Sequence, residues 1–182
     1  MLIKSGLNVS AKFKLRDLIP VGTAAFVVVA DQLTKLLIMT NFSLHEQKSI
    51  IPGIFNLVYV TNTGAAFGFL AGDKSWLRQV FFVGVAFVAL AVIIYAYGHL
   101  RKQGEIFAYS LGLIGGGALG NLIDRLRYGS VVDFLDFYVG SHHWPAFNAA
   151  DSAITVGVGL FLLGTLLQYK QERTESENKI KL

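Results

Sequence analysis

The sequence contains no cysteine, and this absence removes several kinds of chemistry. A chain without thiols forms no disulfide, no thiolate nucleophile, no cysteine-ligated zinc site and no iron–sulfur cluster. Any reaction that the protein carries out must therefore use aspartate, glutamate, histidine, serine, lysine or tyrosine.

Charged residues are also scarce. Only 15% of the 182 residues are charged, while 53% are hydrophobic and the mean hydropathy is +0.52. Soluble globular domains carry about 25% charged residues, so this composition is typical of a protein whose solvent is lipid. The formal net charge of +4 is attributed to residues that flank the membrane segments, and we expect no nucleic-acid partner.

Four apolar runs are long enough to cross a membrane, because a bilayer core of about 30 Å needs roughly 20 mostly apolar residues per helix. They cover residues 18–39, 80–97, 106–123 and 153–169. The predicted fold class is therefore a mainly α membrane protein, with four transmembrane helices in one domain, residues 1–170. The first run is too long for a cleaved signal peptide, and Asp31 and Lys35 interrupt it.

Basic residues are distributed unevenly between the two sides of this arrangement. If the helices alternate in direction, one side carries Lys4, Lys12, Lys14, Arg16, Arg101, Lys102, Lys170, Arg173, Lys179 and Lys181. The opposite side has fewer basic residues in two longer loops, 40–76 and 125–150. The positive-inside rule therefore predicts that both termini are cytoplasmic and that the two long loops face outward.

The segments outside the apolar runs differ in character. Residues 54–60 are rich in β-forming residues and precede the turn-forming residues 61–64, so we expect a small sheet outside the membrane, between the first two helices. Residues 171–182 are polar and of mixed charge, and we predict that they form a disordered cytoplasmic tail.

Polar residues inside the apolar runs need an explanation, since a charged side chain there costs about 2.5–3.5 kcal/mol. Asp31 and Lys35 lie four residues apart on one helix face, in the acid-first order that stabilises a helix. This pair either neutralises itself near the outer end of the helix or shapes a site, and both interpretations remain open at this point.

The third expected helix carries two patterns. Glycine recurs at every fourth position, at Gly112, Gly116 and Gly120, which predicts a flat stripe for close helix packing. Asn121, Asp124 and Arg125 then share one face at the outer end of the helix. Taken alone, the last group is explained by an Asp–Arg pair that ends the span.

Two acids, Asp133 and Asp151, precede the last helix. Asn148 is a typical N-cap residue, which places Asp151 at the third helical position, where a carboxylate suits the free N–H groups and the helix dipole. Capping does not explain Asp133, whose neighbours are Val-Val on one side and Phe-Leu on the other. A second role is therefore needed for this acid.

Two carboxylates brought together at an apolar interface do not both ionise easily, so one of them holds a proton near neutral pH. The ionised acid can activate a water for attack on a peptide carbonyl, while the protonated acid binds the carbonyl oxygen. Because a helix start favours an ionised side chain, we expect Asp151 to be charged and Asp133 to hold the shared proton.

Two other mechanisms fit the sequence less well. His142 and His143 suggest a metal site, but adjacent histidines in a loop lack the helical i, i+4 spacing of metal ligands, and we expect no metal. A Ser–Lys mechanism that uses Lys35 would need a serine in a recognisable motif, and the sequence supplies none.

These motifs together resemble one known family, the bacterial lipoprotein signal peptidases, also called signal peptidase II. The resemblance covers nearly the whole chain. It rests on Asp31-x-x-x-Lys35, Asn62-Thr63-Gly64-Ala65-Ala66-Phe67, Gly117-Ala118-Leu119-Gly120-Asn121-Leu122-Ile123-Asp124-Arg125, Val131-Val132-Asp133-Phe134 and Phe147-Asn148-Ala149-Ala150-Asp151-Ser152. Ala149 departs from the family pattern, in which a bulkier aliphatic residue is common.

The resemblance implies an aspartyl endopeptidase of the inner membrane that cleaves prolipoprotein signal peptides just before a lipid-modified cysteine, without a cofactor. It implies that Asp133 and Asp151 are the catalytic pair. The supporting residues that it implies are Asn121, Asp124, Arg125 and Asn148, which hydrogen-bond to the pair, and Asp31, Lys35, Asn62 and Gly64, which shape the surrounding site. The expected partners are lipid-modified prolipoproteins and membrane lipids, and we expect a monomer.

Two alternatives come from other classes of protein. A small transporter or channel could use Asp31, Asp124, Asp133 and Asp151 as an ion or proton relay. A relay predicts carboxylates spread through the membrane depth, whereas these four fall at the outer ends of their helices. A membrane scaffold packed by the glycine stripe would leave the polar motifs without a purpose.

Overall fold

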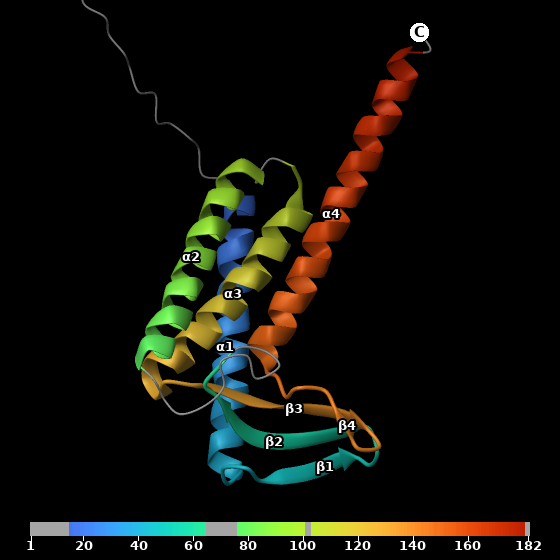
Figure 1. Ribbon diagram of the computed structural model, residues 1–182. Coiled ribbons are helices and arrows are strands. Elements are labelled where there is room, and N and C mark those ends of the chain that lie inside the picture. Colours follow the sequence, from blue (N-terminus) through green and yellow to red (C-terminus); the bar gives the residue numbers. More distant parts are fainter. Residues whose placement is uncertain (1–14, 65–75, 101–102, 181–182) are drawn as a thin grey trace, which may run out of the picture.

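The computed structural model describes residues 15–64, 76–100 and 103–180 (Figure 1). Four long helices run side by side, and a small sheet lies across one end of them. A short 3-10 helix, Leu15–Leu18, leads into the first of the four, and their bounds are α1 Ile19–Asn41, α2 Trp76–Leu100, α3 Glu105–Tyr128 and α4 Ala149–Ile180. All four are long and apolar enough to span a membrane, which confirms the predicted fold class.

Some residues used in the sequence analysis lie outside the described part of the chain. They are Lys4, Lys12, Lys14, Ala65, Ala66, Phe67, Arg101, Lys102 and Lys181. The second motif of the family resemblance is therefore described only up to Gly64.

The prediction of a disordered C-terminal tail is wrong, because α4 continues to Ile180. Arg173 and Glu177 form an i, i+4 ion pair at 2.9 Å, and the hydroxyls of Thr174 and Ser176 donate to carbonyls one turn earlier. Glutamate, lysine, arginine and glutamine are good helix formers, so a polar segment can prolong an existing helix without burying any surface.

The helix α3 is the centre of the bundle and contacts α1, α2 and α4. A Cβ added at Gly112 would lie 2.8 Å from the Pro20 carbonyl oxygen, and one at Gly116 would lie 2.8 Å from that of Ala24. Only glycine lets the α1 backbone approach this closely, so the predicted stripe is confirmed as the α1–α3 interface. By contrast, α2 buries none of its residues and packs at the edge of the bundle.

The sheet is antiparallel, with the strand order β1 (Gln47–Ile51), β2 (Phe55–Asn62), β3 (Val131–Val139) and β4 (His142–His143). The first two strands confirm the sheet expected after α1, although β2 runs two residues into the expected turn. The other two come from the loop between α3 and α4, for which no strand was predicted. The sheet therefore ties the two loops together.

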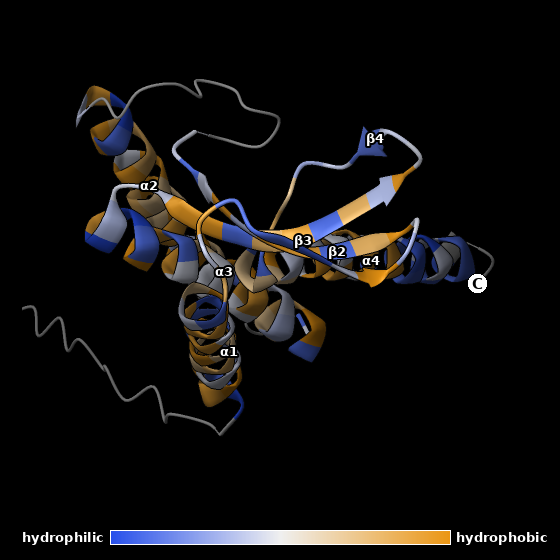
Figure 2. Ribbon diagram, turned by 90° about the horizontal axis from the view of Figure 1, so that it is seen from below, coloured by the Kyte–Doolittle hydropathy of each residue, from blue (hydrophilic) through white to orange (hydrophobic). Residues whose placement is uncertain are grey.

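Two features of the sheet determine which side chains reach the helices. The register between β2 and β3 shifts between Leu57 and Val60 on β2, while β3 remains regular and its side chains alternate. Figure 2, which views the molecule from the sheet end, shows hydrophilic positions set among hydrophobic ones along this strand. Ile38 at the end of α1 packs with Val132 and Phe134 to form a small core beneath the sheet.

Candidate active site

The start of α4 is held by a reciprocal cap. The Asp151 N–H donates to Asn148 Oδ1 at 3.0 Å, and the Asn148 N–H donates to Asp151 Oδ2 at 3.3 Å. Two N–H groups at the helix start are satisfied in this way, as in a capping box. The predicted N-cap is confirmed, and it fixes one oxygen of Asp151.

The second acid, Asp133, enters from β3 and has an exposed fraction of only 2%. Its Oδ1 accepts from Asn148 Nδ2 at 2.7 Å, and its Oδ2 accepts from Asn62 Nδ2 at 3.1 Å. Asn62 Oδ1 in turn accepts the Gly64 N–H at 2.9 Å. Asn148 therefore bonds to both acids, and both oxygens of Asp133 have a donor.

Burial and, to a smaller extent, the nearby charge of Asp151 together raise the pKa of Asp133 to about 7, although hydrogen bonds from Asn62 and Asn148 oppose the shift. A carboxyl group with this pKa is substantially protonated near neutral pH. The expectation that Asp133 holds a proton is thus supported by its surroundings.

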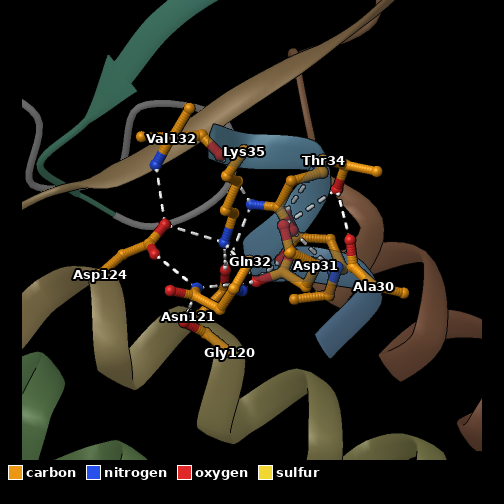
Figure 3. Close-up of polar contacts among 12 residues, drawn as sticks. Ala30, Asp31, Gln32, Thr34, Lys35, Gly120, Asn121, Asp124 and Val132 are labelled. Atoms are coloured by element: carbon orange, nitrogen blue, oxygen red, sulfur yellow. Dashed lines mark hydrogen bonds and ion pairs between the residues drawn. The ribbon is translucent and has the colours of Figure 1, made fainter. Parts of the chain in front are cut away.

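A buried cluster of charges lies between α1 and α3 (Figure 3). Lys35 Nζ lies 2.8 Å from Asp31 Oδ2 and 2.8 Å from Asp124 Oδ2. Gln32, which the sequence analysis missed, donates to Asp124 Oδ1 at 2.8 Å. The sequence feature that could have indicated a role for Gln32 is its position next to Asp31 within an apolar run.

This arrangement settles the two open interpretations of the polar residues on these helices. Asp31 and Lys35 form the pair that their spacing predicts, but Asp124 joins them, so the pair is part of a larger site. Asp124 pairs with Lys35 and not with Arg125, which means that the Asp–Arg interpretation is wrong. The spacing along one helix did not indicate a partner on another.

The charge cluster contacts the start of α4 at two points. Asp31 Oδ1 accepts the Ala150 N–H at 2.9 Å, and Asn121 Nδ2 donates to Asp151 Oδ1 at 2.7 Å. Asp124 Oδ2 also accepts the Val132 N–H at 3.1 Å, next to Asp133. The cluster thereby links the elements that carry the two acids.

Arg125 lies at the edge of this region. Its guanidinium donates to the carbonyls of Asn121 and Gly64 at 3.3 and 3.4 Å, and it lies over the Phe82 ring at 5.2 Å from the centroid. Gln79 of α2 donates to the Arg125 carbonyl at 3.0 Å. Arg125 therefore joins α2, α3 and Gly64 of the first outer loop.

Both acids line a cavity of about 820 Å³ between β2, α3 and the start of α4. Polar lining residues include Asn62, Asn121 and Arg125, while Trp144 and Phe147 form part of an apolar wall. A mostly apolar cavity with a few convergent polar groups is the usual form of a ligand site. The sequence analysis identified the polar groups but missed the wall, whose residues come from a loop without periodicity.

The histidine pair lies away from this cavity's acids. His143 Nδ1 contacts Asp136 Oδ1 at 2.9 Å, on the sheet. Within residues 15–64, 76–100 and 103–180, no group of three histidine, aspartate or glutamate side chains could hold a metal ion.

The family model of signal peptidase (SPase) II matches residues 23–167, a span that contains every residue of the site. The chain belongs to the signal peptidase II family. It is thus a multi-pass membrane protease of the signal peptidase type.

Relatives in this family include two lipoprotein signal peptidases. The chain is 45% identical to that of Syntrophus aciditrophicus over 152 residues, which cover 84% of this chain and 94% of the relative. It is 48% identical to that of Syntrophotalea carbinolica over 153 residues, which cover 84% of this chain and 91% of the relative.

Two solved structures of bacterial membrane enzymes share the fold of this signal peptidase II family member. One, determined by the in meso method at 2.3 Å resolution, aligns with a TM-score of 0.72 at 32% identity, covering 84% of this chain and 90% of that one. The other, at 1.9 Å resolution, aligns with a TM-score of 0.68 at 34% identity, covering 81% and 92%.

Proposed function

We propose that this chain removes signal peptides from lipoprotein precursors as an aspartic endopeptidase, with Asp133 and Asp151 as the catalytic pair. The observation that carries the proposal is the position of Asn148, which bonds to both acids beside the cavity. Two carboxylates at one site, of which Asp133 is buried, favour one shared proton because their like charges oppose joint ionisation. The name of the relatives, lipoprotein signal peptidase, supports the choice of substrate.

In the proposed reaction, the ionised Asp151 removes a proton from a water molecule, whose oxygen attacks the peptide carbonyl. Asp133 donates its proton to the carbonyl oxygen, so a neutral tetrahedral intermediate forms. When this intermediate collapses, the C–N bond breaks, the proton on Asp151 passes to the leaving amine, and the hydroxyl proton returns to Asp133. The pair then has its starting charge.

The supporting residues have separate roles in this proposal. Asn62, Gly64, Asn121 and Asn148 supply or orient the hydrogen bonds to the acids. Asp31, Lys35 and Asp124 hold α1, α3 and the start of α4 together. Arg125 keeps Gly64 of the first outer loop against α3.

The site's location supports a substrate that is anchored in the membrane. The acids lie where the sheet meets the helix ends, so a precursor with a lipid-modified cysteine could keep its lipid in the bilayer while its peptide enters the cavity. We therefore propose cleavage just before that cysteine. A relay across the membrane is disfavoured, because Asp31, Asp124, Asp133 and Asp151 belong to one connected cluster.

The proposed orientation has both termini in the cytoplasm of a bacterial inner membrane and the sheet on the outer side. It is supported by the basic residues in the last turns of α4, such as Lys170, Arg173 and Lys179. With 32 residues at about 1.5 Å each, α4 is longer than a bilayer core of about 30 Å. Its polar last turns would then project into the cytoplasm of a monomeric enzyme.

The test is to incubate the purified chain with a lipidated precursor and with the same precursor lacking the lipid, and to weigh the products. We expect cleavage of the lipidated form alone, at the peptide bond directly before the modified cysteine. Cleavage of both forms, or cleavage elsewhere, would contradict the proposed specificity, and the absence of any cleavage would contradict the proposed function.

A further inference from the structure

Lys35 is buried to an exposed fraction of 1%, and all three of its N–H bonds have an acceptor. Two acceptors are the carboxylates of Asp31 and Asp124, each at 2.8 Å. The third is the side-chain oxygen of Asn121 at 3.1 Å. An ammonium carries three donors, so none remains for another group, and its position is fixed from three sides.

Asn121 lies between this ammonium and the catalytic pair. Its Oδ1 accepts from Lys35 and also from Asn148 Nδ2 at 3.2 Å, which only an oxygen can do. Its Nδ2 must then point to the other side, where it donates to Asp151 Oδ1 at 2.7 Å. An amide turned by 180° would present its NH2 to the ammonium and its oxygen to Asp151.

Three asparagines donate to the two acids, and they are oriented by different means. The oxygen of Asn148 is fixed by the Asp151 N–H, and the oxygen of Asn62 is fixed by the Gly64 N–H. These donors belong to the backbone and cannot be exchanged. The oxygen of Asn121 is instead fixed by side chains, one of which is charged.

We infer that Lys35 is a positioning residue for the proposed reaction: through Asn121 it directs an N–H to Asp151 and so holds Asp151 as the ionised partner of the pair. The inference rests on the proposed function, and it explains by electrostatics how Asp151 is kept ionised. Lys35 does not touch the substrate or the reacting atoms. It acts by the direction of one amide and by its charge.

Other charged groups around Asp151 must be considered in any test based on pH. In the described part of the chain they are Asp31 and Lys35 from α1, Asp124 and Arg125 from α3, and Asp133 from β3. Removing Lys35 alone would leave Asp31 and Asp124 buried without their cation, which destabilises a protein strongly. A useful variant must therefore keep the charge of the cluster constant.

The experiment compares Asp124→Asn with the double variant Lys35→Met/Asp124→Asn. The double variant has the same formal cluster charge as the natural chain, and Asp31 keeps its bond to the Ala150 N–H. The asparagine at 124 can still accept the Val132 N–H through its oxygen. The two variants therefore differ only in the side chain at position 35. The double variant lacks the ammonium and its single positive charge.

The measurement is kcat/KM for the lipidated precursor as a function of pH. Without the ammonium, Asp151 is protonated in less acidic solutions, so the acidic limb of the double variant should lie about one pH unit above that of Asp124→Asn. Below that limb kcat/KM should be about tenfold lower, mostly through kcat. Acidic limbs at the same pH in the two variants would overturn the inference.

A second measurement uses the unmodified chain in lipid bilayers, so that it does not depend on the folding of a variant. Solid-state NMR can detect the dipolar coupling between Lys35 15Nζ and Asn121 13Cγ. We expect this coupling together with a coupling between Asn121 15Nδ2 and Asp151 13Cγ. Absence of either would overturn the inference, whereas a failure of the unmodified chain to cleave the precursor would count against the proposed function.

Discussion

Asp133 and Asp136 lie three residues apart on β3 and are both almost fully buried, with exposed fractions of 2% and 5%. An odd separation on a regular strand places them on opposite faces of the sheet. Asp133 faces the cavity and Asp151. Asp136 accepts from Asn56 Nδ2 at 2.8 Å and contacts His143 Nδ1 at 2.9 Å.

The difference between the two acids lies in the neighbouring group and not in their burial. Each acid has an asparagine donor, but Asp136 also has an imidazole, which can carry a positive charge. Asp133 has a second carboxylate nearby, which raises its pKa in addition to the effect of burial. Burial makes a carboxylate sensitive to its neighbours, and the second carboxylate beside Asp133 favours the protonated form of that acid.

The largest effect is expected from Asp133→Asn compared with Asp136→Asn. Asp133→Asn, like Asp151→Asn, should lower kcat for the lipidated precursor by at least about 10³-fold, because the acid or the base of the reaction is lost. Asp136→Asn should retain most of the activity. Size-exclusion chromatography and melting temperature would confirm folding, and near-normal turnover by Asp133→Asn would break the comparison.

The asparagines beside the two acids offer a second matched pair. Asn148→Ala should lower kcat/KM by about 10- to 100-fold through the loss of the Nδ2 donor to Asp133, and should destabilise α4 by about 0.5–2 kcal/mol through the loss of its cap. Asn56→Ala should lower stability by about 1 kcal/mol and leave kcat/KM unchanged. Steady-state kinetics and thermal unfolding separate the two, and a loss of activity in Asn56→Ala would contradict the division.

The pH dependence of kcat/KM should reflect the titration of Asp133 and should not depend on Asp136. Because the pKa of Asp133 is raised to about 7, its proton is present below that pH and lost above it. As an acid, Asp133 is active when protonated, so kcat/KM should fall about tenfold per pH unit above a limb near pH 7. The same limb is expected in Asp136→Asn, and its displacement in that variant would show that Asp136 takes part.

The smallest effect is expected from His143→Phe, which keeps an aromatic ring against Tyr138 and removes the contact with Asp136. The His143 side chain is 46% exposed, and exposed ion pairs contribute about 0–1 kcal/mol, so stability should fall by no more than this. His142→Phe is the control on the same strand. Turnover should be unchanged in both variants. A marked loss in His143→Phe alone would show that the contact between His143 and Asp136 contributes to catalysis.

The features that the sequence predicts are those encoded by neighbouring residues. The four spans follow from runs of apolar residues, the cap from Asn148 and Asp151, and the helix interface from glycine at every fourth position. Each of these depends on contacts within one turn or one helix face. The pairing of β2 with β3 joins segments about seventy residues apart, as in Val60 and Asp133, and no local pattern reveals such a register.

The sequence predicts most residues of the candidate site, but it does not predict which of them contact one another. The partner of Asp124 is Lys35 on another helix, and Gln32 and the wall around Trp144 join the site only when the chain is folded. The helical tail was missed for the opposite reason. Its i, i+4 pairs are local, but composition suggests disorder whenever a segment has nothing to bury.

The glycine stripe of α3 also determines distances between charges. A Cβ at Gly120 would lie 2.6 Å from Asp31 Oδ2, and that carboxylate has little room to move because Lys35 and the Ala150 N–H hold it. Because Gly120 has no side chain, α1 and α3 approach closely at the Asp31 carboxylate. Widening this gap by one methyl group would lengthen the ion pairs as well as loosen the packing. The distance between α1 and α3 therefore sets both the helix packing and the strength of the ion pairs beside the two acids.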